Sequence, residues 1–304
     1  MLGTVLLSAS RSPGLRRVVV ATPATRRVVD RFVAGEALAD ALAVIGRLTS
    51  AGLTVTLDHL GEDVTSPAAA RAARDAYLRA VEAVGAAGLG SAVEVSVKLS
   101  AFGQALPGGH DIALANVQPV AAAAFAAGTT VTLDMEDSST VDSTLAVHAA
   151  LRQRYPGTGV VLQSYLHRTP DDARALAVAG SRVRIVKGAY REPPSVALQD
   201  KRKVDEAFVR CLRILMSGAG YPMVASHDPA MIEAALRMAG PDTTFEFQML
   251  YGMRPAEQRR LVAAGHRVRV YLPYGTDWYG YFMRRLAERP ANLLFFARAL
   301  TTKR

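Results

Sequence analysis

"LTVTLDHLGEDVTSPAAARAARDAYLRAVEAVGAAGLGSAVEVSVKLS", residues 53–100, contains one unit of a repeating pattern. It opens on a β-branched run, passes through a polar cluster, continues as an Ala- and Arg-rich segment with helical periodicity, and closes on a second β-branched run. Ser66 precedes Pro67 where the helix should begin, and Gly88 stands where it should end. A strand, a helix and a second strand in this order predict two parallel strands joined by a crossover helix.

The pattern continues along the rest of the chain. The β-branched runs are 53–60, 93–100, 130–137, 160–166, 182–190, 221–228, 244–250 and 266–275. Because eight such units alternate with helical segments over about 240 residues, the sequence predicts an α/β protein with a closed (βα)8 barrel. A doubly wound sheet is the alternative, but no G-x-G-x-x-G follows the first strand, and "GAAGLG" at 85–90 has the wrong spacing.

Composition predicts one compact domain. About half of the 304 residues are apolar and 21% are charged, and no low-complexity linker divides the chain. We expect residues 1–50 to form an N-terminal helical segment and 51–304 to form the barrel. The single cysteine, Cys211, lies at an apolar position of a helical segment and is expected to be buried. With no apolar run long enough to span a bilayer and no basic region before the apolar start, we expect a cytoplasmic protein.

The net charge of +9 would suit nucleic acid, anionic membrane or an acidic substrate. In "ARAARDAYLRAVEA", however, the basic residues alternate with acidic ones along a helix, which is typical of a solvated face. We therefore expect no nucleic-acid partner. A basic module that binds anionic lipid or nucleic acid remains the non-enzymatic alternative.

In a (βα)8 barrel, functional residues gather where the strands end at their carboxyl termini. Polar residues occur at this end of nearly every expected strand: Asp58, His59, Lys98, Ser100, Asp134, Glu136, Asp137, Gln163, Tyr165, His167, Arg184, Lys187, Tyr190, Ser226, His227, Asp228, Glu246, Gln248 and Tyr271. One interpretation is structural, with Lys98, Asp134, Arg184 and Glu246 paired as a buried ion network. The mixed charges at one rim favour the other interpretation, a site for an ionic ligand.

Two other chemistries compete for these residues. Carboxylate oxygens suited to a divalent cation occur at Asp134, Glu136, Asp137 and Asp228, but neighbouring cationic side chains would repel the metal. The compact spacing of zinc ligands is missing from His59, His167 and His227. We therefore expect no metal. A lysine on a barrel strand also suits a Schiff base with a carbonyl substrate. Lys98 and Lys187 are the candidates for such an aldolase or lyase.

Seven motifs resemble the bacterial monofunctional proline dehydrogenase family, and the resemblance runs from about residue 30 to the end of the chain. The motifs are "VSVKLSAFG", "LDMEDSS", "LQSYLHRT", "RIVKGAYREP", "YPMVASHDP", "FEFQMLYGMR" and "YLPYGTDWYGYFMRRLAERPANL". The resemblance implies a distorted (βα)8 TIM barrel with a final helix over its mouth, noncovalently bound FAD, and oxidation of L-proline to Δ1-pyrroline-5-carboxylate, the first step of proline catabolism to glutamate. It also implies hydride transfer from proline C5 to FAD N5, a membrane quinone as electron acceptor, and peripheral membrane contact.

The resemblance assigns roles motif by motif. Arg184 resembles the arginine that hydrogen-bonds flavin N5, and Asp134 resembles the active-site aspartate, so both are expected to be catalytic. The expected cofactor-binding residues are Met135, Gln163, Arg184, Lys187, Gly188, Ala189, Ser226 and His227. Many family members carry threonine where this chain has Ser226, and the hydroxyl is retained.

The same family resemblance implies that the substrate is bound by Lys98, Tyr271, Tyr281, Arg284 and Arg285. Arginine suits the carboxylate of proline because its planar guanidinium can hold two oxygens at once. Glu288 lies four residues after Arg284, the spacing of a helical ion pair, and is expected to balance part of the positive charge.

Overall fold

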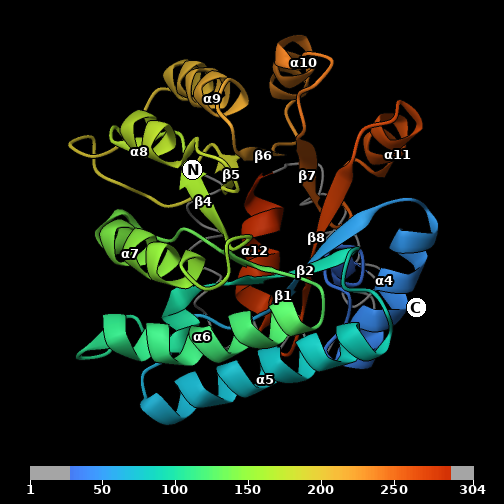
Figure 1. Ribbon diagram of the computed structural model, residues 1–304, viewed down its shortest axis with the longest axis vertical. Coiled ribbons are helices and arrows are strands. Elements are labelled where there is room, and N and C mark those ends of the chain that lie inside the picture. Colours follow the sequence, from blue (N-terminus) through green and yellow to red (C-terminus); the bar gives the residue numbers. More distant parts are fainter. Residues whose placement is uncertain (1–27, 289–304) are drawn as a thin grey trace, which may run out of the picture.

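The computed structural model describes residues 28–288, except for the side chains of residues 284 and 286–288. Eight parallel strands form a closed barrel in chain order, as predicted (Figure 1). They are β1 (Thr54–His59), β2 (Val93–Val97), β3 (Val131–Leu133), β4 (Gly159–Gln163), β5 (Arg182–Val186), β6 (Tyr221–Ala225), β7 (Glu246–Leu250) and β8 (Val268–Tyr274). The barrel closes where β1 pairs with β8, from Thr54 opposite Arg269 to His59 opposite Tyr274.

Helices surround the barrel on the outside (Figure 1). They are α5 (Pro67–Ala86), α6 (Gly109–Ala126), α7 (Val141–Arg152), α8 (Thr169–Leu176), α9 (Lys201–Met216), α10 (Pro229–Met238) and α11 (Pro255–Ala263). The predicted beginning and end of helix α5 are confirmed. The Ser66 hydroxyl accepts a hydrogen bond from the Ala69 amide at 3.2 Å, Pro67 occupies the first turn, and Gly88, with φ of +66°, follows the last turn.

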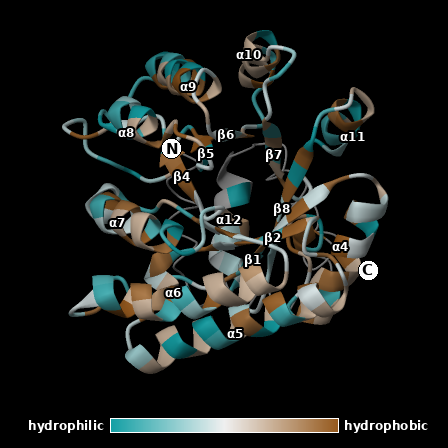
Figure 2. Ribbon diagram, viewed as in Figure 1, coloured by the Kyte–Doolittle hydropathy of each residue, from teal (hydrophilic) through white to brown (hydrophobic). Residues whose placement is uncertain are grey.

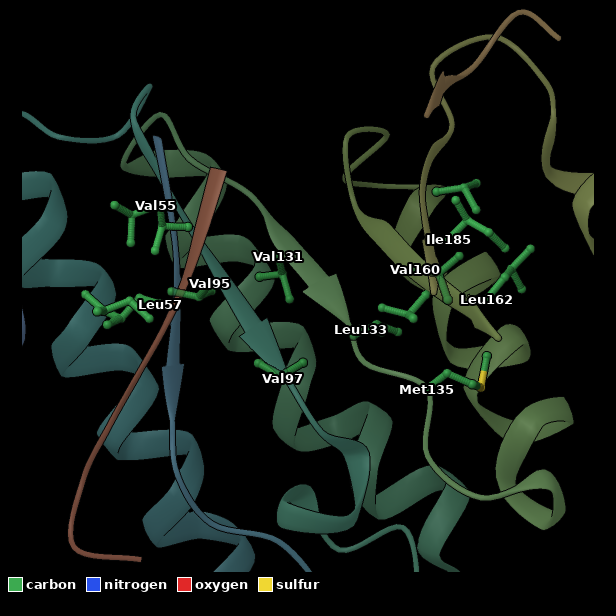
Figure 3. Packing of buried hydrophobic residues seen from close by; sticks show 14 of the residues in the cluster. Val55, Leu57, Val95, Val97, Val131, Leu133, Met135, Val160, Leu162 and Ile185 are labelled. Atoms are coloured by element: carbon green, nitrogen blue, oxygen red, sulfur yellow. The ribbon is translucent and has the colours of Figure 1, made fainter. Parts of the chain in front are cut away.

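The apolar core lies between the barrel and the helices. Alternate residues of a strand point to opposite faces, and one set from each strand, such as Val55 and Leu57 or Val95 and Val97, packs in this layer (Figure 3). Apolar residues are concentrated on the strands, whereas the helices carry hydrophilic residues as well (Figure 2). The other set of strand residues is left to fill the barrel, and much of that set is charged.

The barrel departs from a regular one at its seam. Helix α12 (Trp278–Glu288), which follows β8, lies within the ring of helices rather than outside it, over the carboxyl ends of the strands (Figure 1). The outer position beside β8 and β1 is occupied instead by α4 (Leu38–Ser50) from the N-terminal side of the chain. The predicted final helix over the barrel mouth is therefore confirmed.

The described part of the N-terminal segment holds α12 in place. Phe32 and Phe282 pack with ring centroids 6.3 Å apart in a second apolar cluster. The Trp278 indole donates to the Glu36 carboxylate at 3.0 Å, and the Ala34 amide donates to the Pro273 carbonyl at 2.9 Å. Residues 1–27 of the expected helical segment lie outside the described residues.

Seven of the eight predicted runs extend beyond the strands at their carboxyl ends. The run 130–137, for example, contains a strand only from Val131 to Leu133. The Asp134 amide still donates to the Val97 carbonyl at 2.8 Å, but beyond it the backbone turns into a short 3-10 helix at Ser138–Thr140. Strand-like composition therefore continued into loops, because the polar residues there bind other side chains rather than extend the sheet.

Cys211 is fully buried, as expected, and burial raises the pKa of its thiol to about 11. It therefore remains a protonated packing residue at neutral pH. Among the described residues, none of the helices combines the length and apolar composition needed to cross a membrane.

His148 gives the fold a pH dependence. Its imidazole is 2% exposed and contacts the Thr158 carbonyl at 3.1 Å, and burial lowers its pKa from 6.5 to about 4. A lowered histidine pKa means that the unfolded chain binds the proton first, so the stabilising contribution is complete above about pH 6.5 and falls as pH drops toward 4. At pH 4.5 the loss should be about 2–3 kcal/mol.

We therefore expect His148→Gln to flatten the pH dependence of the free energy of unfolding between pH 7 and 4.5, compared with the unsubstituted protein. Urea titrations at several pH values measure this difference. Equal slopes in the two proteins would show that His148 does not carry the effect.

Candidate active site

Arg184 is the centre of the polar interior. Its guanidinium, on β5, is bonded to side chains of three other segments: through Nη1 to Asp134 at 2.7 Å and Ser96 at 3.0 Å, through Nη2 to Glu94 at 3.1 Å, and through Nε to Gln248. Strands β5 and β2 are three positions apart in the barrel, so these side chains meet only in its interior. The arginine is thus fixed in one orientation.

Lys98 forms the second part of the cluster, nearer the end of β2. Its ammonium lies 3.0 Å from Asp58, 3.4 Å from Asp134 and 3.2 Å from the Tyr271 hydroxyl. The Tyr271 hydroxyl in turn donates to the second oxygen of Asp134 at 2.7 Å. Four of the predicted site residues, Lys98, Asp134, Arg184 and Tyr271, are therefore one hydrogen-bonded group.

Charge interactions set the protonation of this group. Burial acts to lower the pKa of Lys98, but the Asp58 and Asp134 carboxylates raise it well above its usual value. Burial acts to raise the pKa of Asp134, but Lys98 and Arg184 hold it below its usual range. At neutral pH Lys98 is therefore an ammonium and Asp134 a carboxylate. An amine held as the cation is not a nucleophile, which weighs against a Schiff base at Lys98.

The network continues toward the amino-terminal end of the barrel, beyond the residues predicted for it. Glu94 also binds Arg182 at 2.7 Å, and Glu246 binds Arg269 at 2.7 Å. The alternative interpretation, a buried ion network, thus holds for Lys98, Asp134 and Arg184, whereas Glu246 pairs with Arg269 instead. The acids Asp58, Glu94, Asp134 and Glu246 face the bases Lys98, Arg182, Arg184 and Arg269 in equal number.

Glu94, Arg182 and Arg269 were missed, although the sequence contained a signal for them. Arg182 lies two positions before Arg184, Arg269 lies two positions before Tyr271, and Glu94 lies four positions before Lys98. Side chains two apart on a strand share a face. A further polar side chain two or four positions before a polar strand end is therefore expected to face the barrel interior as well.

Two groups at the mouth have capacity for a ligand. The Gln163 side chain is 2% exposed and donates to the Met135 carbonyl at 3.2 Å, while its Oε1 atom has no hydrogen-bond partner among the described residues. Arginine has five N–H bonds, and the described residues accept four from Arg184. A buried acceptor without a partner is costly, so a bound polar group would satisfy it.

The backbone after β5 has a conformation that leaves no room for a side chain at Gly188. Gly188 has φ of +122°, and a Cβ there would lie 2.3 Å from the Tyr165 ring. Lys187 bridges two carboxylates, Asp228 at 2.7 Å and Asp205, so this loop is tied to α9 and to the start of α10. Ala189 is exposed beside them. The two ion pairs also argue against Lys187 as a Schiff-base amine.

The remaining predicted cofactor contacts, Ser226 and His227, follow β6 at the same end of the barrel. The Ser226 hydroxyl accepts from the Asp228 amide at 3.1 Å, and His227 Nε2 accepts from the Leu250 amide at 2.9 Å. Asp228 itself caps α10. These bonds shape the loop between β6 and α10.

Helix α12 brings the last predicted residues to the mouth. Tyr281 is 7% exposed, and the Arg285 guanidinium carbon lies 5.2 Å from the centre of its ring. The side chains of Arg284 and Glu288 lie outside the described ones, so their predicted roles are left as predictions. In residues 28–288, no three His, Cys, Asp or Glu side chains are grouped to hold a metal ion.

A closed barrel with converging polar side chains at the carboxyl ends of its strands defines the class of (βα)8-barrel enzymes. A family model described as proline dehydrogenase matches residues 41–298. This chain therefore belongs to the proline dehydrogenase family.

Two curated relatives match the chain over most or all of its length. Proline dehydrogenase 1 of Bacillus subtilis is 37% identical over 307 aligned positions, which cover 100% of both chains. The proline dehydrogenase of Deinococcus radiodurans is 41% identical over 281 positions, 90% of each chain. A crystal structure of proline utilization A (PutA) from Bdellovibrio bacteriovorus, inactivated by N-propargylglycine, aligns with a TM-score of 0.79 at 27% identity. That alignment covers 87% of this chain but 33% of the PutA chain.

The position of Gly188 leads to a prediction. We expect Gly188→Ala to lower the free energy of unfolding by about 3 kcal/mol or more, because the new methyl group meets the Tyr165 ring and φ is unfavourable. Gly88→Ala is the matched control, since Gly88 also has positive φ but has open space around its Cβ position, and should cost only about 1 kcal/mol. Chemical denaturation compares the two, and equal losses would contradict the steric argument.

Proposed function

We propose that this chain oxidises L-proline to Δ1-pyrroline-5-carboxylate, using FAD bound noncovalently at the barrel mouth. The observation that carries the proposal is the hydrogen-bonded group of Lys98, Asp134, Arg184 and Tyr271 at that mouth, in a chain of the proline dehydrogenase family. The reaction is the first step of proline breakdown toward glutamate.

The residues at the mouth fit a flavin. The unpartnered Gln163 Oε1 would accept a hydrogen bond from a ring N–H, and the remaining N–H of Arg184 would donate to a ring nitrogen. Gly188 allows the backbone to approach the cofactor closely, and Lys187 and Ala189 would line the same segment. When bound, FAD supplies the two-electron acceptor for the hydride that proline loses. A fixed Arg184 cation would favour the negative charge that the cofactor gains.

Cationic side chains would hold the substrate. Proline carries a carboxylate, and Arg285, which lies over the Tyr281 ring on α12, would bind it. The family resemblance assigns Arg284 and Lys98 to the same role. The surrounding positive charge would lower the pKa of the proline amine, which must be neutral for C5 to give up a hydride readily. The Asp134 carboxylate, which Lys98 and Arg184 hold ionised, offsets part of this positive charge around the substrate.

The electron acceptor is also part of the proposal. The family resemblance supports a membrane quinone, which would bring the protein into peripheral contact with a membrane. Two alternatives are disfavoured: the ion pairs of Lys98 and Lys187 oppose a Schiff-base aldolase, and family membership opposes a purely basic binding module.

The proposal predicts a yellow protein whose flavin absorption bleaches when L-proline is added without oxygen, while an equal concentration of sodium chloride has no effect. Absorption spectra measure both. A colourless protein that gains no bound flavin when FAD is supplied would refute it. Borohydride trapping of a carbonyl compound on Lys98 or Lys187, detected by mass spectrometry, would instead favour the aldolase.

The proposed carboxylate contact predicts the effect of Arg285→Met. Loss of a charge-assisted hydrogen bond should raise KM for proline about 10-fold or more, with a smaller change in kcat. Arg259→Met, at an exposed arginine of α11, is the control for removing a positive charge elsewhere. Steady-state kinetics compare the two variants. An unchanged KM in Arg285→Met would remove Arg285 from the substrate site.

A further inference from the structure

Glu94 is a buried acid to which the proposed reaction assigns no role. It lies on β2, four positions before Lys98 and so about 13 Å nearer the amino-terminal end of the barrel. Its carboxylate is 1% exposed. One oxygen accepts from Arg184 at 3.1 Å and from the Thr56 hydroxyl at 2.8 Å, and the other accepts from Arg182 at 2.7 Å.

Glu94 is a carboxylate at neutral pH. Burial acts to raise its pKa, but Arg269, Arg182 and Arg184 together lower it to about 2. A carboxylate enclosed by three guanidinium groups cannot leave them without leaving buried charge unpaired, which is strongly destabilising. Its position and charge are therefore constant over the pH range in which an enzyme works.

The contact between Glu94 and Arg184 affects both the orientation and the charge of that arginine. Asp134 and Glu94 grip different nitrogens of the same guanidinium, Nη1 and Nη2, while Gln248 holds Nε. Of these partners Glu94 is the only acid on β2, and it comes from the amino-terminal half of the barrel. Glu94 therefore orients the plane of the Arg184 guanidinium and offsets part of its positive charge from the amino-terminal side of the barrel.

We propose that Glu94 is a positioning residue for the oxidation: it holds Arg184 in the plane that faces the mouth and sets how much of its charge acts on a flavin bound there. The inference rests on the proposed function, because it needs a cofactor beside Arg184. It assigns Glu94 control of the reduction potential and of kcat, and little control of KM.

A purely structural role makes a different prediction. If Glu94 only neutralised Arg182 and Arg269, its removal would reduce stability and leave the potential of the bound flavin alone. The two roles therefore separate through whether the potential shifts at all, and the sign of a shift follows the charge that was removed. Removing the Glu94 charge makes the surroundings of Arg184 more positive, whereas removing the Arg182 charge makes them more negative.

The test compares Glu94→Gln and Arg182→Met as flavin-loaded proteins. Spectroelectrochemical titration should give a higher midpoint potential in Glu94→Gln and a lower one in Arg182→Met, because a reduced, anionic flavin is favoured by positive surroundings. The higher potential alone would favour flavin reduction, but Arg184 also loses a charged contact that fixes its plane, so Glu94→Gln should lower kcat about 10-fold with KM for proline changed much less. Unfolding of the flavin-free proteins, followed by circular dichroism, measures stability separately.

Glu246→Gln is the matched control, because Glu246 is equally buried and paired with Arg269 but touches Arg184 only through Gln248. It should lose a similar amount of stability and a smaller part of kcat. If Glu94→Gln does not fold, Glu94→Asp replaces it: the charge is kept but the side chain is one methylene shorter and loses its contact with Arg184, so kcat should fall with KM little changed, and an unchanged kcat would overturn the inference. Wild-type potentials in both variants would overturn the inference alone, while a wild-type protein that takes up no FAD would overturn the proposed function with it.

Discussion

The ion pair between Arg184 and Asp134, 2.7 Å apart in the barrel interior, is the interaction on which the rest of the structure depends. Burying either charge alone would cost several kcal/mol, so each needs the other and needs further partners. Those partners come from other strands and are themselves buried charges that need partners. The resulting network contains four acids and four bases. The interior of this barrel is therefore a balanced salt network rather than the packed layers of branched apolar residues common in such folds.

A polar interior moves the hydrophobic stabilisation outward. Val55, Leu57, Val95 and their equivalents pack against the helices, and this outer layer forms the main apolar cluster of the protein. The two faces of each strand thus have separate tasks. The outward face holds the helices in place, and the inward face holds charged groups in fixed positions, which is what preorganised electrostatics at an active site require.

The seam of the barrel explains how the mouth is covered. Because α4 occupies the outer position beside β1 and β8, the helix after β8 is free to lie over the carboxyl ends of the strands. The apolar contact between Phe32 and Phe282 and the bond from Trp278 to Glu36 hold it there. Tyr281 and Arg285 are carried to the mouth by this arrangement, and an insertion that displaced α4 would affect them although they lie far away in the chain.

The sequence by itself determined the strand count, their order, the closed barrel and most of the residues at its mouth, because alternation of β-branched and helical segments is a local property. Family motifs added expected roles for residues such as Gln163 and Gly188, which no periodicity indicates. Only the tertiary structure decided that Arg184 bonds to Glu94, that Glu246 pairs with Arg269, and that Gln163 keeps an unpartnered oxygen. These contacts join residues up to 90 positions apart, and they exist only because the barrel closes and brings the inward faces of different strands within reach of one another.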